Sequence, residues 1–342
     1  MFVNNKQRGY AQPMAGASYV LGVDLGGTKI LAAVVSQSGE ILGRAKKKTK
    51  PERPAEEILG RIAACCREAV EAAQVPLADI TAVGIGSPGP LDPIKGTVIE
   101  TPNINLVNAP ITGFLSQDLG VPAYIDNDVN VGTFGEYVYG AGQGRKHVIG
   151  IFMGTGIGGG LIVDGKLLHG FSYNAGELGH IKLVVNGRKC GCGQRGCLEA
   201  YASKTAMIRS LQRSIKKGKS TILTKLIGED WSKLTSSVFS QAVEAKDKLV
   251  LREIKTAARF TGIGVGSLIN VLSPEMVIIG GGLMGTLSDL ILPIIQDYAK
   301  KNCFPIMYEG VEIVPARLGD DAGILGAAAI AWEKVNLAKT GA

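Results

Sequence analysis

The chain lacks any run of about 18 consecutive apolar residues, the length that a bilayer-spanning helix requires, so we expect no membrane partner. The N-terminal residues also lack the apolar segment of a secretory signal peptide, and we expect none. Cysteine is sparse, with six residues among 342. Cys65, Cys66 and Cys303 are interpreted as ordinary core or surface residues. This cysteine usage predicts a reducing compartment, and we expect a cytoplasmic protein.

The charge distribution does not indicate a nucleic-acid partner. The formal net charge is +7, and much of the excess lies in lysine-rich segments at 46–50 and 216–219. Such runs are typical of solvated surface, so we expect no nucleic acid to bind. Residues 1–18 are polar, and we expect a disordered tail that is too short for a DNA-binding helix-turn-helix. The remaining length and the 46% hydrophobic content favour two globular domains.

A compact group of potential metal ligands organises the middle of the chain. One imidazole and three thiols lie within 18 positions: His180, Cys190, Cys192 and Cys197. This Cys₃His set suits tetrahedral Zn²⁺, and the glycines between its members allow a tight loop. A chance cluster of cysteines is the alternative interpretation. A disulfide between Cys190 and Cys192 is not expected, because a bridge across one intervening residue has poor geometry. We interpret the zinc as structural, with Glu177 and Glu199 beside it facing a polar substrate.

The N-terminal part alternates strands with glycine turns. Three successive strands are predicted: residues 19–24, 28–35 and 41–48. No helix follows Gly26 and Gly27, which excludes the dinucleotide-binding fingerprint. Asp24 ends a strand beside glycine N–H groups that can face an anion, and Thr28 adds a hydroxyl. A plain glycine hairpin is the alternative interpretation.

The next segment ends in a group of polar residues. We expect an amphipathic helix, a strand, a rigid turn, a polar loop and a second strand at residues 54–74, 80–85, 86–90, 91–110 and 122–125. Asn103 in the loop is either a turn residue or a sugar contact. Asp126, Asn127 and Asp128 then precede a helix, although one cap is sufficient. The surplus indicates chemistry, because the helix dipole keeps a carboxylate ionised and ready to accept a proton.

The strand–turn–strand pattern recurs in the second half. Strands at 147–153 and 161–163 flank a glycine-dense turn at 154–160, and a third strand is expected at 166–169. Two copies of one unit imply two similar lobes that close on one ligand and grip a polyphosphate with their glycine hairpins.

The remaining predicted elements are helices at 198–217 and 247–272, shorter helices at 220–245, strands at 276–279 and 311–315, and a helix from about 284. A last helix is predicted at 319–335, with Asp320 and Asp321 as N-caps.

Together these motifs resemble the ROK family of sugar kinases and repressors, within the actin/hexokinase/Hsp70 superfamily, from residue 19 to about 335. The matching segments are DLGGTK at 24–29, GSPGP at 86–90, TPN at 101–103, ND at 127–128, GTGIGG at 154–159, ELGH at 177–180, the cysteine segment through Glu199, and GGG at 280–282.

The resemblance implies an α/β, two-lobed actin-like/hexokinase ATPase fold, which is a duplicated ribonuclease H-like unit. The small lobe would comprise 19–132 plus about 323–342. The large lobe would comprise 133–322, with the zinc-binding segment at 180–197. A homodimer is also implied.

The same resemblance implies a hexose kinase that uses ATP and Mg²⁺, with Asp128 as the catalytic base and a structural Zn²⁺ on the Cys₃His set. The implied sugar-binding residues are Asn103, Asn127, Asp128, Glu177, His180 and Glu199, with His180 using the ring nitrogen that does not bind zinc. The implied nucleotide-binding residues are Asp24, Gly26, Gly27, Thr28, Gly154, Thr155, Gly156, Gly158, Gly281 and Gly282.

Three functions stay open at this point. A glucokinase is favoured by the TPN element at 101–103 and by Asp128. A kinase for N-acetylmannosamine, N-acetylglucosamine, fructose or allose is favoured by the lack of a tryptophan in residues 104–110. A non-enzymatic regulator does not explain the complete base and phosphate turns. Polyphosphate in place of ATP also stays open as the donor.

Overall fold

The computed structural model describes residues 18–101 and 103–340, so the predicted tail, apart from its last residue, and Pro102 lie outside the described residues. The chain divides into two compact units. The first unit comprises the residues up to 139, 169–174 and those from 320, and the second comprises 140–168 and 175–319. This division assigns residues 133–139 and 169–174 to the first unit, whereas the predicted lobe boundary lay at 132.

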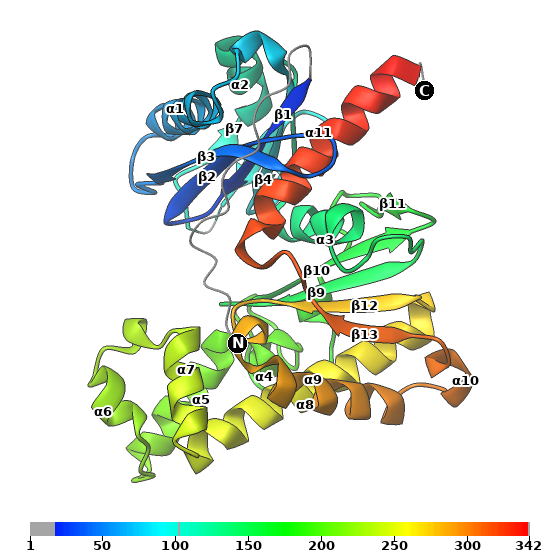
Figure 1. Ribbon diagram of the computed structural model, residues 1–342. Helices are drawn as coiled ribbons and strands as arrows, with labels where there is room; N and C mark the ends of the chain where they lie inside the picture. The colour runs from blue at the N-terminus through cyan, green and yellow to red at the C-terminus, as the bar shows by residue number, and fades with distance from the viewer. Residues whose placement is uncertain (1–17, 102, 341–342) are drawn as a thin grey trace. The chain divides into compact units, whose positions relative to one another are not determined.

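The first unit is built on a five-stranded sheet in the order β3-β2-β1-β4-β8 (Figure 1). Its strands are β1 Tyr19–Leu25, β2 Lys29–Val35, β3 Ile41–Lys48, β4 Ile80–Ser87 and β8 Ala123–Asn127. The first three strands are antiparallel, and β1, β4 and β8 are parallel. The central strands are almost wholly apolar because helices cover both of their faces.

Helices α1 Ala55–Ala73 and α2 Ile111–Leu119 pack on one face of this sheet, and α3 Asp128–Tyr139 and α11 Ala322–Thr340 pack on the other (Figure 1). Two glycines in the central strands let α11 approach the sheet backbone. A Cβ at Gly22 would lie 2.0 Å from the Ile324 carbonyl oxygen, and one at Gly84 would lie 1.8 Å from that of Ala327. The close approach fixes where α11 begins, next to the end of β1.

The predicted loop at 91–110 is wrong in part, because it contains a small antiparallel sheet. Its strands are β5 Leu91–Asp92, β6 Thr97–Glu100 and β7 Val107–Ala109. The Asp92 carboxylate accepts hydrogen bonds from the backbone N–H groups of Ile94 and Lys95, and this side-chain turn closes the β5–β6 hairpin. Strands this short carry too few alternating residues to be predicted from periodicity.

The second unit repeats the arrangement with the order β11-β10-β9-β12-β13. Its strands are β9 Val148–Met153, β10 Ile157–Val163, β11 Lys166–Leu167, β12 Met276–Gly280 and β13 Glu312–Pro315. As in the first unit, an antiparallel hairpin precedes parallel strands. The predicted duplicated actin-like/hexokinase fold is therefore confirmed.

One large apolar core holds the helices of the second unit on its sheet. These helices are α4 Glu199–Ala202, α5 Lys204–Lys216, α6 Leu223–Ile227, α7 Ser236–Glu244, α8 Lys248–Leu272, α9 Met284–Lys301 and α10 Pro305–Tyr308. None of the helices in the described ranges is long and apolar enough to cross a bilayer.

Four predicted boundaries in the second half need correction. The turn at 154–160 is shorter, because β10 begins at Ile157 and Gly158 lies inside this strand. The strand predicted to end at residue 169 ends at Leu167. The helix at 198–217 is interrupted at Ser203, whose hydroxyl accepts a hydrogen bond from the Ala206 N–H at 3.1 Å and begins α5. Asp320 and Asp321 lie in a separate 3₁₀ turn, Gly319–Asp321, before α11 begins.

Candidate active site

The glycine turn of the first unit is held by a threonine that the sequence analysis missed. The Gly26 N–H donates to the Lys29 carbonyl at 2.9 Å, which closes the turn between β1 and β2. Thr49, which is fully buried, donates its hydroxyl to the Gly26 carbonyl at 2.6 Å, and its N–H bonds to the Thr28 carbonyl at 3.1 Å. Thr49, the residue that follows β3, thus fixes the turn through two hydrogen bonds. A Cβ on Gly27 would lie 3.6 Å from the Asn103 Cβ, so Asn103 lies beside this turn.

Two carboxylates meet at the end of β1. Burial raises the pKa of Asp24 to about 6, and the neighbouring Asp128 and Asp320 carboxylates act in the same direction, whereas Lys29 lowers it. Gly323 lets the start of α11 pass this carboxylate, because a Cβ there would lie 2.9 Å from the Asp24 Cγ. The structure therefore brings Asp24 and Asp128 together next to the glycine turn. Such a concentration of negative charge favours a divalent cation or a proton between the groups.

The three polar residues at the start of α3 have separate tasks. Asp126 is buried, and one of its carboxylate oxygens accepts from the Asn127 N–H at 2.7 Å and from the Asn130 amide at 2.9 Å. Asn127 caps the helix, since its side-chain oxygen accepts from the Val129 N–H at 2.9 Å. Asp128 is the first helical residue and is half-buried. One of its carboxylate oxygens accepts from the Val129 N–H at 2.9 Å.

A histidine that the sequence analysis missed supports this group. Nε2 of His169 lies 2.5 Å from the other carboxylate oxygen of Asp126. This hydrogen bond raises the pKa of His169, while burial opposes the change. His169 follows the short strand β11 and is distant in sequence from Asp126, so no local pattern could have predicted the contact.

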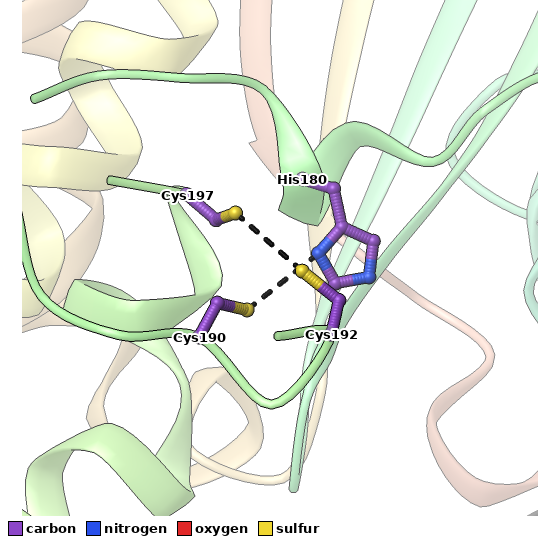
Figure 2. Close-up of side chains that lie close together, drawn as sticks. All are labelled: His180, Cys190, Cys192 and Cys197. Atoms are coloured by element: carbon purple, nitrogen blue, oxygen red, sulfur yellow. Dashed lines mark hydrogen bonds between the residues drawn. The ribbon is translucent and has the colours of Figure 1, made fainter. Parts of the chain in front are cut away.

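The predicted metal ligands of the second unit converge, as Figure 2 shows. His180 ends the 3₁₀ turn Leu178–His180, and the cysteines follow on the next loop. The ligand atoms of the four residues lie within 4.8 Å of one another. Sγ of Cys190 lies 3.7 Å from Nδ1 of His180, and the Sγ atoms of Cys192 and Cys197 are 3.8 Å apart.

These separations fit a tetrahedral zinc ion. Zn–S and Zn–N bonds of about 2.3 and 2.0 Å place neighbouring ligand atoms roughly 3.5–3.8 Å apart at tetrahedral angles. Three thiolates and a neutral imidazole would give a Zn²⁺ centre one negative charge. The Lys182 ammonium donates to the Cys197 sulfur at 2.9 Å and can balance that charge. Without a metal, burial raises the pKa of the Cys190 thiol to about 12, so metal binding must displace a proton there.

The two glutamates beside this ligand group differ in their surroundings. Glu199 begins α4, and one of its carboxylate oxygens accepts from the Ile157 N–H at 3.0 Å while the other lies 3.3 Å from the Cys190 sulfur. Glu199 thus connects the ligand group to the second glycine turn, Gly154–Gly156, because Ile157 directly follows this turn. Glu177 lies with its carboxylate 3.8 Å from Nε2 of His180, and its side chain is 64% exposed. The imidazole therefore directs Nδ1 to the thiols and Nε2 to Glu177.

The second glycine turn is held by the start of α5. The Gly154 N–H donates to the Gly156 carbonyl at 2.9 Å. The Thr155 carbonyl accepts the Thr205 hydroxyl at 2.7 Å. Gly156 must lack a side chain, because a Cβ there would lie 2.5 Å from a Glu199 carboxylate oxygen.

The glycines after β12 lie against this turn. Gly281 has φ +107°, and a Cβ there would lie 2.1 Å from the Met153 carbonyl oxygen at the end of β9. Gly282 lies against the start of α7, where a Cβ would meet the Ser236 hydroxyl at 2.7 Å. The second unit therefore brings the predicted nucleotide-binding glycines together, with Gly158 displaced into β10.

Comparisons with known proteins agree with this geometry. The profile of the ROK family matches residues 20–334. The chain is 36% identical over 321 residues to the glucokinase of Thermotoga maritima, covering 92% of this chain and 98% of the relative. It is 29% identical over 314 residues to a putative xylose repressor of Caldicellulosiruptor sp., covering 91% of this chain and 77% of the repressor. The crystal structure of a ROK family glucokinase from Streptomyces griseus in complex with glucose and AMPPNP is similar, with a TM-score of 0.78, 35% identity, and coverage of 92% of this chain and 100% of that one.

Proposed function

The chain belongs to the ROK family and is a sugar kinase, and we propose that it transfers the γ-phosphoryl group of ATP to the 6-hydroxyl of glucose. One observation carries the proposal. A half-buried carboxylate, Asp128, stands at the start of α3 beside Asp24 of the glycine turn. A base and a phosphate-binding turn are what phosphoryl transfer requires of a protein, since the reaction depends on positioning and charge stabilisation.

Asp128 is proposed as the base. A hexose hydroxyl is too weak an acid to be deprotonated in advance, so the carboxylate would accept the proton as the oxygen–phosphorus bond forms. The helix dipole of α3 favours an ionised carboxylate at this position. The contacts of Asp126 and Asn127 hold the peptide that carries it, so that little reorganisation is needed during the reaction.

The two glycine turns are proposed to bind the nucleotide. The turn at Asp24–Thr28 and the turn at Gly154–Gly156 are rich in glycine, and the backbone N–H groups of such turns suit phosphate oxygens. Asp24 is proposed to face the Mg²⁺ that accompanies ATP, which supplies positive charge to the phosphoryl oxygens. Gly281 and Gly282 are proposed to lie by the nucleoside, because their bare backbone adjoins the second turn.

The sugar is proposed to be bound by polar side chains. The candidates are Asn103, Asn127, Glu177, His180 and Glu199. His180 suits this task because its Nε2 is directed away from the thiols. We propose that a structural Zn²⁺ is held by His180 and the three cysteines and keeps this imidazole and Glu199 in place. The family resemblance also supports a homodimer, which analytical ultracentrifugation can test.

Two other activities are tested by the same experiment. Kinases of this fold that act on other sugars remain an alternative, and the similarity to a xylose repressor supports a regulator as a second one. The experiment is a coupled ADP-release assay with glucose, mannose, fructose, allose, N-acetylglucosamine and N-acetylmannosamine. We expect the highest kcat/KM with glucose. A higher kcat/KM with another sugar would show that this sugar, and not glucose, is the preferred substrate. No ADP release with any of the sugars would contradict the kinase proposal.

A further inference from the structure

The short segment that follows β3 in the first unit is hydrogen-bonded to two parts of the proposed site. Its first residue, Thr49, holds the glycine turn between β1 and β2, because its hydroxyl donates to the Gly26 carbonyl at 2.6 Å. The next four residues, 50–53, form a β-turn, which the Arg53 N–H closes by donating to the Lys50 carbonyl at 3.1 Å. The β-turn is therefore joined directly to the residue that fixes the glycine turn.

Asn105 lies in the loop that carries Asn103, and it packs on this β-turn through two hydrogen bonds. Its backbone N–H donates to the Pro51 carbonyl at 2.9 Å, and its side-chain amide donates to the Arg53 carbonyl at 3.2 Å. The second bond requires a side-chain donor, which an ionised aspartate of the same shape does not have. The amide of Asn105 thus ties the Asn103 loop to the segment that begins with Thr49.

The residues around Asn105 keep the loop from moving independently. Its two neighbours, Ile104 and Leu106, are buried in the apolar core of the first unit. The Thr101 hydroxyl donates to the Ile104 carbonyl. Asn103 is exposed, so its side chain is accessible to a ligand while the adjacent loop is fixed in the core.

The same loop also meets the glycine turn directly. A Cβ added to Gly27 would lie 3.6 Å from the Asn103 Cβ and 3.7 Å from the Asn103 carbonyl oxygen. The turn proposed for the phosphates and the loop proposed for the sugar therefore touch each other, and both are hydrogen-bonded to residues 49–53. A shift of the loop on the β-turn would move Asn103 relative to the glycine turn.

We propose that Asn105 is a positioning residue, which fixes the Asn103 loop against the glycine turn so that sugar and nucleotide each raise the affinity for the other. The inference rests on the proposed sugar kinase function and concerns how its two ligands are aligned. A ligand that orders the turn also orders the loop, so the second ligand loses less conformational freedom on binding. Linkage makes the effect on affinity equal in both directions.

The test measures the Kd of the sugar by calorimetry, alone and with saturating AMPPNP and Mg²⁺. The sugar is the one with the highest kcat/KM in the assay described above, which we expect to be glucose. The variants are Asn105→Ala and the isosteric Asn105→Asp. The control is Asn108→Gly, which removes an amide from β7 at a φ of +48° that glycine adopts readily. Melting temperatures and steady-state kinetics are recorded for all of them.

We expect AMPPNP to lower the sugar Kd of the wild type and of the control by about fivefold or more. In both Asn105 variants this effect should be largely lost, and KM for the sugar should rise by about threefold to tenfold, as the loss of one hydrogen bond predicts. The kcat with both substrates saturating and the melting temperature should stay close to wild type, because bound ligands hold the loop in place. A residue with only a structural role would lower the melting temperature and leave the effect of AMPPNP unchanged.

Two results overturn the inference while leaving the proposed function intact. One is a sugar Kd of the wild type that does not respond to AMPPNP. The other is a wild-type response in either Asn105 variant. Failure of the wild type to phosphorylate any of the sugars contradicts the inference and the proposed function together.

Discussion

His169 and Asp126, from distant parts of the sequence, are joined by a contact of 2.5 Å between Nε2 and a carboxylate oxygen. The other oxygen of Asp126 holds the backbone of Asn127 and the side chain of Asn130. The peptide that carries Asp128 is therefore anchored by a buried carboxylate that is itself held by an imidazole. This chain of contacts links a titratable group to the position of the proposed base.

The first prediction concerns stability against pH. The hydrogen bond with Asp126 raises the folded-state pKa of His169 above its ordinary value of about 6.5. Its contribution to stability is therefore complete below that value and is lost as pH rises through the raised pKa. Charges of Lys334 and Glu333 on α11 also act on His169, in opposite directions. We expect urea denaturation to show a destabilisation of His169→Gln that is largest near pH 5.5 and smaller at pH 9. A pH-independent difference would contradict this, and His147→Gln is the control.

The second prediction is that replacing Asp24 increases stability and lowers activity. Burial raises its pKa to about 6, so the ionised carboxylate is unfavourable in the folded state above that pH. Asp24→Asn should therefore raise the melting temperature at pH 8, and this gain should vanish below about pH 4, where aspartate is protonated in both states. Activity should fall by about tenfold or more, because the carboxylate that is proposed to face the Mg²⁺ of ATP is lost. A variant that is less stable at pH 8 argues against the assigned burial.

The third prediction concerns the metal. Cys192→Ser should lose bound zinc and raise KM for glucose together, because the ligand group holds His180 and Glu199. The measurements are zinc content by mass spectrometry and steady-state kinetics. Cys303→Ser, which lies outside the group, should change neither quantity. A zinc-free variant with an unchanged KM would separate the metal from sugar binding.

The fourth prediction concerns Thr49, whose hydroxyl holds the Gly26 carbonyl. Thr49→Val leaves that carbonyl without its partner, and we expect KM for ATP to rise by about tenfold while glucose affinity stays near the wild-type value. Thr49→Ser keeps the donor and should restore most of the loss. Equal kinetics for the two variants would show that the hydroxyl does not position the turn.

The sequence analysis predicted the features that depend on residues close together in the chain. The strands β1, β2, β3 and β9 were predicted correctly, because the patterns that indicate them act over a few residues. The Cys₃His group was also predicted, since its members are close in sequence. Thr49 and His169 were missed, because each contacts a residue that is distant along the chain.

Glu199 shows a different limit. Its proximity to the cysteines predicted a carboxylate near the metal ligands, and the structure places it there. Its second contact, with the N–H of Ile157, depends on how α4 packs beside β10. Only tertiary structure reveals that this carboxylate connects the Cys₃His group to the second glycine turn.

The most direct test of the account is the turnover of Asp128→Asn with saturating glucose and ATP, together with glucose affinity from calorimetry. We expect kcat to fall by about 10²-fold or more, because the proton acceptor is lost, while the glucose Kd stays within about twofold of wild type. Asp289→Asn on α9 serves as the control and should keep full activity. A variant at position 128 that retains near-wild-type kcat would contradict the central role of this carboxylate.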